Sequence, residues 1–461
     1  MVQKIGETVR QLLREESDPA RAVRRLLASS KPEDAEALKD YLRYEYSQCL
    51  LEAYRTNVGA YYTPKHLVDL VRQVVRPHLT DNSYVLDLSA GCGAFLDGFP
   101  PERTAARDVD ERAVQILKAL GFSNVAQDNS LVNVSRTKYG LSQQDHLVIV
   151  GNPPYNDTTS KNKRALKVPG KIAADPDIAT NDYGISFLRT FCKLRADVIC
   201  VLHPLSYLIK PANFRKLGLF THNYRLRTGI IFSSEEFSDT RHTPFPVMCA
   251  LYVRASMDYE YVRTFPFDIL REPKKFVLSK AETIDGYIRK YPPSKDIPKK
   301  SNIGLYMYNI RDTNSLLTSG NLTEKENFAC NITVNFCDLY KYAYLNCMKR
   351  YFGKHYLFGN LSPIVRKSDL ENSPFFRNLF IIDAIVNNQN LATFNVRNRR
   401  SIVFTQGLLE TYHRNAKSCS PEERFIYRAF VNFVEGKEVA PSATRSYIQD
   451  YFERLRESMT A

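Results

Sequence analysis

Short apolar runs of strand length alternate with amphipathic, helix-length segments through the first half of the chain. Residues 66–75 and 183–194 carry apolar side chains at helical spacing. The short apolar runs that we expect to form strands are 84–88, 104–110, 123–127, 148–150 and 197–202. Two further runs, 227–232 and 247–253, predict a hairpin. Together these patterns predict an α/β fold around a doubly wound sheet.

The two ends of the chain differ from this region. Residues 1–50 have apolar positions at helical spacing and predict helices, with breaks at Asp18-Pro19 and Lys31-Pro32. From residue 258 onward the alternation of strand and helix is lost, and residues 421–456 predict a final helix. We therefore expect an N-terminal helical segment at 1–50, a sheet domain at 51–257 and a separate, irregular α/β domain at 258–461.

A glycine-rich turn follows the first predicted strand. Asp87 stands near the end of that strand, and Gly91 and Gly93 follow before a new apolar run. In a doubly wound sheet, such a turn opens into the first helix and lets the backbone approach a nucleotide-like ligand. Leu96 occupies the place of the third glycine of a dinucleotide motif, and no Lys-Ser/Thr pair of a phosphate loop is present. The turn therefore favours S-adenosyl-L-methionine over a dinucleotide or a triphosphate.

A stiff polar corner, Asn152-Pro153-Pro154-Tyr155, follows the run 148–150. Asn152 offers a side-chain carbonyl, Pro153 a main-chain carbonyl and Tyr155 a flat ring, which together suit a planar ring with an exocyclic amine. Two carbonyls fixed in advance would direct the lone pair of that amine at an electrophile, with no strong base. The alternative is a turn in which the two prolines merely end the strand.

These two stretches, together with Gly59–Pro64, resemble the motifs of gamma-class N6-adenine DNA methyltransferases over residues 55–255. The resemblance implies a Rossmann-like, S-adenosyl-L-methionine-dependent methyltransferase domain at 51–257 and a DNA target-recognition domain at 258–461. It also implies double-stranded DNA as the substrate and a restriction-modification system whose companion restriction endonuclease is a separate chain. Two alternatives remain open: the same chemistry on an RNA adenine or a protein glutamine, and a DNA-specificity subunit without catalysis.

The resemblance assigns residues to the target base. Asn152 and Pro153 would orient the amine of an adenine that has swung out of the duplex. Tyr155 would stack on one face of the base, and an aromatic residue from the loop 233–246 would stack on the other. We choose Phe237 over Phe245 for that second face.

The resemblance also assigns residues to the cofactor. Asp108, with Asp110 as the second choice, would hold the ribose, and Asp128 would accept a hydrogen bond from the amino group of the cofactor's adenine. Asp108 or Asp110 could instead cap the next helix, and Thr63 and Pro64 also suit the N-cap and first turn of the helix 66–75. The full set of expected cofactor contacts is Tyr62, Thr63, Pro64, Asp87, Ser89, Gly91, Gly93, Phe95, Asp108, Asp128 and Asn152.

Composition adds further expectations. A net charge of +14 is expected of a protein that lies along a polyanion, although a generally basic surface is the alternative. The basic segment 156–171 follows Tyr155 and could hold a DNA backbone. No apolar run reaches the roughly 18 residues that a membrane crossing needs, and no leader opens the chain, so we expect a cytoplasmic, nucleoid-associated monomer. Nine cysteines without a Cys-x-x-Cys pair favour reduced thiols, and we expect no metal.

Overall fold

The computed structural model describes residues 19–44, 63–155, 173–237, 244–289 and 442–460, with shorter stretches between 291 and 384. The chain divides into two compact units. The first comprises residues 1–263 with 267–272, and the second comprises residues 264–266 with 273–461. The roles expected of the sequence domains, catalysis and target recognition, stay predictions.

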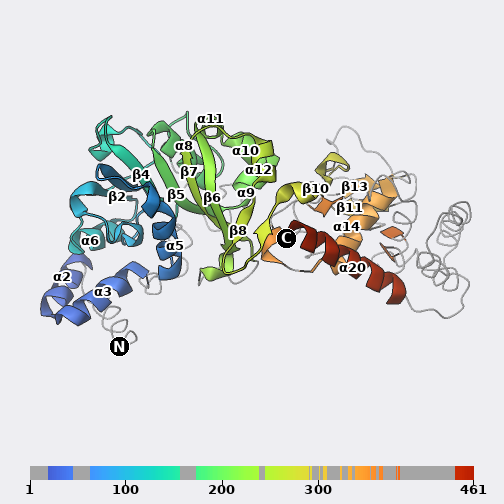
Figure 1. The fold of residues 1–461 in the computed structure, drawn as a ribbon, viewed down its shortest axis with the longest axis horizontal. Coiled ribbons are helices and arrows are strands. Elements are labelled where there is room, and N and C mark those ends of the chain that lie inside the picture. Colours follow the sequence, from blue (N-terminus) through green and yellow to red (C-terminus); the bar gives the residue numbers. More distant parts are fainter. Residues whose placement is uncertain are drawn as a thin grey trace, which may run out of the picture. The chain divides into compact units, whose positions relative to one another are not determined.

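The first unit is built on a mixed sheet. Its strands are β1 (Ser83–Asp87), β2 (Thr104–Asp108), β3 (Val125–Gln127), β4 (His146–Gly151), β5 (Val198–Pro204), β6 (Tyr224–Ser233), β7 (Pro246–Arg254) and β8 (Phe267–Ile269). They lie in the order β3-β2-β1-β4-β5-β7-β6-β8, in which the neighbouring strands β4, β5, β7 and β6 are labelled in Figure 1. The neighbouring strands β3, β2, β1, β4 and β5 pair in parallel, whereas β7 is antiparallel to both β5 and β6. The predicted α/β class, the doubly wound order and the hairpin are confirmed.

The predicted helices at 66–75 and 183–194 are present, and residues 19–44 of the predicted N-terminal segment are largely helical, while residues 1–18 and 45–50 of that segment lie outside the described residues. Among the described residues up to 264, the α-helices are α2 (Pro19–Ser29), α3 (Pro32–Tyr44), α5 (Lys65–Val75), α6 (Glu111–Ala119), α8 (Tyr183–Lys193), α9 (Ser206–Ile209), α10 (Pro211–Lys216), α11 (Leu219–Asn223) and α12 (Tyr259–Thr264). α2 and α3 each begin at a proline, at the two breaks expected from the sequence. Proline suits the first turn of a helix because the N–H that it lacks would have no partner there.

Helix α5 covers one face of the sheet. Leu67 and Val71 are buried at helical spacing and belong to one hydrophobic cluster with Val85 of β1 and Val148 of β4. The neighbouring Ile149, whose side chain points to the other face of β4, is also fully buried. The central parallel strands are therefore covered on both sides, which explains their nearly continuous apolar sequences.

The segment after the glycine turn departs from the expectation of a first helix. Ala94–Leu96 forms only a short 3-10 helix. Arg43 of α3 and Arg72 of α5 form ion pairs with Asp97 at 3.0 and 3.2 Å, and Gly98 has a φ of +82°. These contacts and the left-handed glycine turn the chain away from a helical path, so that no long helix connects β1 to β2.

The start of helix α5 also differs from the expectation. Its N-cap position is Pro64, and no side chain caps the helix. The hydroxyl of Thr63 instead accepts a hydrogen bond from Asn152. The predicted N-cap role of Thr63 is therefore wrong, because that hydroxyl is bonded to the end of β4 and not to the helix.

The described part of the second unit is a small α/β structure. Its strands and helices are β9 (Lys275–Phe276), β10 (Glu282–Thr283), β11 (Leu305–Tyr308), β12 (Leu322–Thr323), β13 (Asn331–Val334), α14 (Leu339–Tyr351), α15 (Tyr356–Gly359), β14 (Ile364–Val365) and α20 (Ser442–Met459). β11 pairs antiparallel with β12 and β13, and β10 pairs antiparallel with β14. Tyr344 of α14 packs against Phe452 of α20, with ring centroids 5.4 Å apart. Residues 421–441 of the predicted final helix lie outside the described residues. Within the described ranges, no helix has both the length and the apolar character that a membrane crossing requires.

Candidate active site at the carboxyl ends of β1 and β4

The glycine turn and the Asn-Pro-Pro-Tyr corner meet at one edge of the sheet. β1 and β4 are parallel neighbours, with Leu86 paired to Ile149, so their carboxyl ends point the same way. Gly151, the last residue of β4, has a φ of +147°, and a Cβ added to it would stand 2.7 Å from Asp87 Oδ1. Any larger residue at 151 would collide with the Asp87 carboxyl group. The absence of a side chain at 151 thus allows the two motifs to touch.

Asp87 is a buried acid, and one of its carboxyl oxygens accepts no hydrogen bond from the described residues. Its side chain is 1% exposed, and Oδ1 accepts a hydrogen bond of 3.0 Å from the N–H of Ser89. Oδ2 is buried and has no hydrogen-bond partner among the described residues. Burial raises the pKa of Asp87 to about 8, against the lowering effect of the Ser89 N–H, and the nearby Asp108 raises it slightly further. Such a group favours a ligand that brings positive charge and a donor.

The two glycines of the turn adopt conformations that other residues avoid. Gly91 and Gly93 have φ values of +52° and +84°. A Cβ on Gly93 would also stand 2.7 Å from Leu117 of α6, so both the backbone conformation and the packing require glycine there. The N–H of Gly91 donates to Asp108 Oδ2 over 2.8 Å, which connects the turn to the end of β2.

The structure separates the two acids that could hold a ribose. The carboxylate of Asp108 accepts the N–H groups of Gly91 and Asp110, and burial raises its pKa. Asp110 is the N-cap of α6 and accepts the N–H of Arg112. Asp108 therefore faces the glycine turn, whereas Asp110 serves the helix. Between them lies Val109, an apolar side chain that is 48% exposed and that the sequence analysis did not single out.

Asp128 follows β3 at the same edge of the sheet. Its N–H donates to the carbonyl of Asp108, and its Oδ2 lies 2.7 Å from Lys138 Nζ. The geometry is that of an ion pair and not of a well-directed hydrogen bond. The same ammonium donates to the carbonyls of Asn129 and Val132, so Lys138 ties together the turn that carries Asp128. Lys138 gives no local signal in the sequence, because it lies ten positions from Asp128, in the short 3-10 helix Thr137–Tyr139.

The side-chain amide of Asn152 is held at one end only. Its Nδ2 donates to Thr63 Oγ1 over 3.1 Å. Its Oδ1 is buried, and no described residue donates a hydrogen bond to it. Pro153 is buried, while Tyr155 is partly buried and meets Phe245 edge to face, with ring centroids 6.5 Å apart. The corner therefore combines a buried amide oxygen that has no hydrogen-bond partner among the described residues with an aromatic ring, that of Tyr155, in contact with Phe245.

The two aromatic residues of the loop 233–246 have different environments. Phe237 is 3% exposed and packs in the core beside Phe232, which corrects the expectation that its ring faces a ligand. Phe245 is only partly buried and lies next to Tyr155. Its main-chain N–H and carbonyl are bonded to Ser234, which fixes the backbone on both sides. Phe95, another expected contact, is also in the hydrophobic core, at 5% exposure.

A histidine near this edge is used structurally. His203 lies near the end of β5, is 1% exposed and makes a 2.7 Å hydrogen bond through Nε2 with the hydroxyl of Tyr252. Burial lowers its pKa to about 4. A neutral imidazole that stacks with the rings of Tyr207 and Tyr252 is a core residue. Two other expected features, Tyr62 and the basic segment 156–171, lie outside the described residues.

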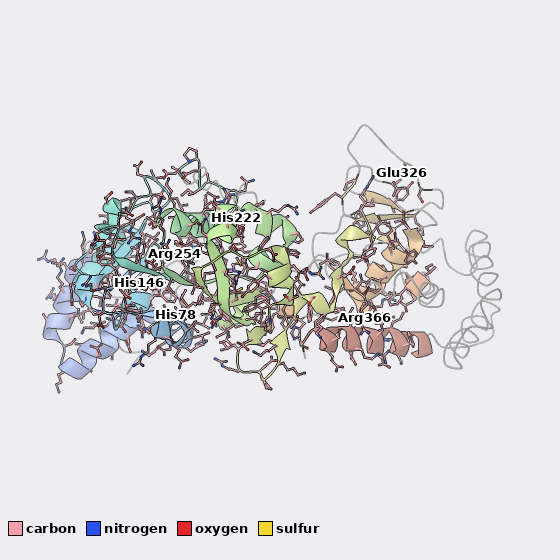
Figure 2. All side chains as sticks on the ribbon, turned by 45° about the horizontal axis from the view of Figure 1, so that its top comes forward. His78, His146, His222, Arg254, Glu326 and Arg366 are labelled. Atoms are coloured by element: carbon pink, nitrogen blue, oxygen red, sulfur yellow. The ribbon has the colours of Figure 1, made fainter. Side chains whose placement is uncertain are left out.

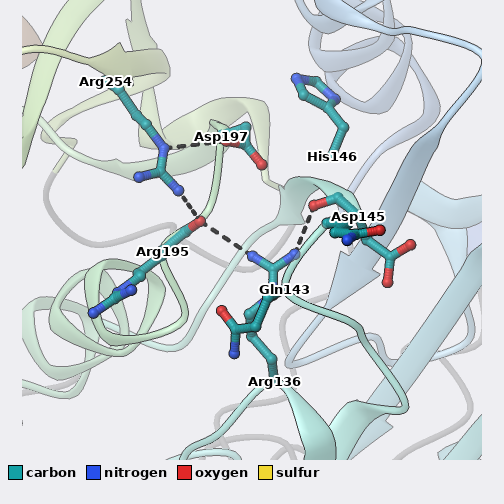
Figure 3. Close-up of a pocket in the computed structure, with 8 residues that line it drawn as sticks. Arg136, Gln143, Asp145, His146, Arg195, Asp197 and Arg254 are labelled. Atoms are coloured by element: carbon teal, nitrogen blue, oxygen red, sulfur yellow. Dashed lines mark hydrogen bonds and ion pairs between the residues drawn. The ribbon is translucent and has the colours of Figure 1, made fainter.

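A polar hollow of about 330 Å³ lies at the opposite edge of the sheet, where β4 and β5 begin. Figure 3 shows that the guanidinium groups of Arg136 and Arg254 bind to the protein itself. Arg136 donates to the carbonyls of Ser142, Asp145, Leu194 and Arg195, and Arg254 pairs with Asp197 at 3.1 Å. His146, labelled with Arg254 in Figure 2, is bonded to Ser83. The residues that line this hollow therefore form a network of hydrogen bonds and ion pairs that joins the loops preceding β4 and β5. No group of three or more His, Cys, Asp or Glu side chains among the described residues is arranged to hold a metal ion.

Comparisons with known proteins concern the fold. No protein-family model matches the chain, and no curated protein does. A DrdV–DNA complex shares 16% identity and a TM-score of 0.38 over 50% of this chain and 30% of that chain. The modification subunit of a provisionally assigned type I restriction enzyme from Vibrio vulnificus shares 18% identity and a TM-score of 0.34 over 49% of this chain and 51% of that chain. A provisionally assigned class I S-adenosylmethionine-dependent methyltransferase from Listeria monocytogenes shares 12% identity and a TM-score of 0.37 over 56% of this chain and 88% of that chain. The chain thus spans about half or less of the length of the first two proteins.

Proposed function

We propose that this protein transfers a methyl group from S-adenosyl-L-methionine to N6 of an adenine in double-stranded DNA. One observation carries the proposal: Asn152, whose Oδ1 has no hydrogen-bond partner among the described residues, directly follows Gly151, which packs against the carboxyl group of Asp87, whose Oδ2 likewise has none. A site for an amine and a site for a cation are therefore adjacent. Transfer between two bound groups requires this adjacency.

The residues at this edge fit the cofactor. Asp87 Oδ2 would bind the ammonium group, Asp108 the ribose hydroxyls and Asp128 the adenine amine, while Val109 would cover the adenine ring. Burial raises the pKa of Asp87 and of Asp108, and a phosphate beside them would oppose their ionisation further, whereas an ammonium group favours it, so the pair disfavours a nucleotide. When bound, the cofactor supplies a methyl group on a positively charged sulfur.

Asn152 and Pro153 would bind the acceptor. An exocyclic amine has two N–H donors, and the two acceptors suited to it are Asn152 Oδ1 and the carbonyl of Pro153. Binding both hydrogens directs the nitrogen lone pair outward and stabilises the positive charge that develops on N6 during transfer. The surplus proton of N6 then passes to solvent. Strong base catalysis is unnecessary, which agrees with the structural role of His203.

Tyr155 and Phe245 would form the walls around the extruded base. They are adjacent and only partly buried, whereas Phe237 is in the core. Stacking of one base on one ring contributes about 1–3 kcal/mol, which offsets part of the cost of unstacking the adenine. The net charge of +14 suits a DNA backbone. A companion restriction endonuclease on another chain belongs to the same proposal.

Transfer of tritiated methyl groups tests this function. The protein is incubated with labelled cofactor, DNA from a host without adenine methylation, RNA and total protein, and each product is digested with nuclease or protease. We expect label that nuclease releases from DNA alone. The Asn152→Ala variant should bind cofactor and DNA but lose transfer. Label in RNA or in protein would assign the same chemistry to another acceptor.

A further inference from the structure

Thr63 belongs to the expected cofactor segment, residues 62–64, and contacts the Asn-Pro-Pro-Tyr corner. Its side chain is 4% exposed, and it immediately precedes the N-cap residue of α5. The first turn of that helix uses the carbonyl of Pro64, which accepts the N–H groups of Leu67 and Val68. Because no side chain caps α5, the Thr63 hydroxyl is available for another contact.

That contact is with the amide of Asn152. Oγ1 of Thr63 accepts a hydrogen bond of 3.1 Å from Nδ2, across 89 positions of sequence. The terminal torsion of an asparagine is broad, so its packing alone fixes the amide plane weakly. A bond at Nδ2 leaves Oδ1 at the other end of the same plane, where no described residue contacts it through a hydrogen bond.

We propose that Thr63 is a positioning residue that holds the Asn152 amide with its oxygen toward the acceptor amine. The inference rests on the proposed function. If the amide turned over, Nδ2 would face the donors of the incoming amine and could not accept them. Resemblance assigns Thr63 to the cofactor, whereas the contact in the structure assigns its hydroxyl to the catalytic amide.

The role has a distinct kinetic signature. Thr63→Val keeps the shape of the side chain and removes the hydroxyl, while Thr63→Ser keeps the hydroxyl. We expect Thr63→Val to lower kcat for DNA methylation by about ten- to a hundredfold, with the cofactor Kd changed less than about twofold. Thr63→Ser should restore most of kcat. Thr190→Val is the matched control, because Thr190 is fully buried and its hydroxyl bonds to a carbonyl of its own helix.

A second measurement does not depend on activity. The thermal midpoints of Thr63→Val, Asn152→Ala and the double variant form a cycle that reports whether the two side chains interact. We expect the double variant to unfold at about the midpoint of the less stable single variant. If wild type methylates no acceptor, the proposed function fails while this cycle still tests the contact. Additive midpoints, or a Thr63→Val variant whose cofactor Kd rises while kcat holds, would overturn the positioning role.

Discussion

Asp87 Oδ1 lies 2.7 Å from the point where a Cβ on Gly151 would stand. This contact joins the ends of β1 and β4, the two elements that carry the expected cofactor and acceptor motifs. A glycine at 151 is therefore required on two grounds, the left-handed φ of +147° and the space taken by the carboxyl group.

Gly151→Ala should accordingly be far more damaging than an ordinary loop glycine substitution. We expect a loss of roughly 3–5 kcal/mol in the free energy of unfolding, from backbone strain together with the collision. Gly121→Ala is the control, since Gly121 has a φ of +95° but open space around it. It should cost only about 1–2 kcal/mol. Urea denaturation measures both; equal losses would mean that Asp87 does not confine residue 151.

Asp87 should make the protein without cofactor less stable as pH rises. Its pKa is about 8 in the folded state against an ordinary value of 3.8, so between these values the folded protein holds a proton that the unfolded chain releases. The protonated Asp87 contributes fully to the free energy of unfolding below pH 3.8. This contribution declines between pH 3.8 and about pH 8 and is constant above that. Asp87→Asn lacks this titration. The free energy of unfolding of wild type, minus that of the variant, should fall from about pH 5 to about pH 8. A difference that stays constant would show an ordinary carboxyl pKa.

Lys138→Met should weaken cofactor binding. Removing the ammonium releases both Asp128 and the carbonyls of the following turn, so the carboxylate that would accept the adenine amine is no longer held. Titration calorimetry with S-adenosylhomocysteine should show a loss of about three- to tenfold. Lys39→Met removes an ion pair with Glu36 on α3 and serves as the control. If both variants bound S-adenosylhomocysteine with equal affinity, Lys138 would not contribute to the cofactor site.

Phe245 and Phe237 should respond to alanine in opposite ways. Phe237→Ala opens a cavity in the core and should cost about 3–5 kcal/mol of stability. Phe245→Ala should leave the fold nearly unchanged and lower kcat/KM for DNA by about tenfold, because a wall of the base site is lost. Thermal unfolding and methyl transfer are measured on both. A Phe245 variant with normal kcat/KM would contradict the assignment.

Local patterns predicted the elements that carry the site. The apolar run before Asp87, the glycines that follow and the corner at Asn152 are each contiguous, and parallel pairing then places the ends of β1 and β4 at one edge. These features depend on strand periodicity and turn chemistry, which a sequence displays directly.

Contacts between distant segments could not be predicted in the same way. Thr63 and Asn152 are 89 positions apart, and no periodicity links a helix start to a strand end. Phe237 and Phe245 occupy one loop, and their residue type does not say which ring enters the core. Val109 gave a usable signal that was overlooked: an apolar residue between two acids at the end of a strand has no core to enter.

Nucleoside analysis of DNA tests the central claim most directly. DNA lacking methylated adenine is incubated with the protein and S-adenosyl-L-methionine, hydrolysed to nucleosides and analysed by mass spectrometry. The account predicts N6-methyldeoxyadenosine with wild type and its absence with Asn152→Ala, although that variant still binds the cofactor. Methylation at another base, or DNA left unmethylated by a protein that binds the cofactor, would contradict it.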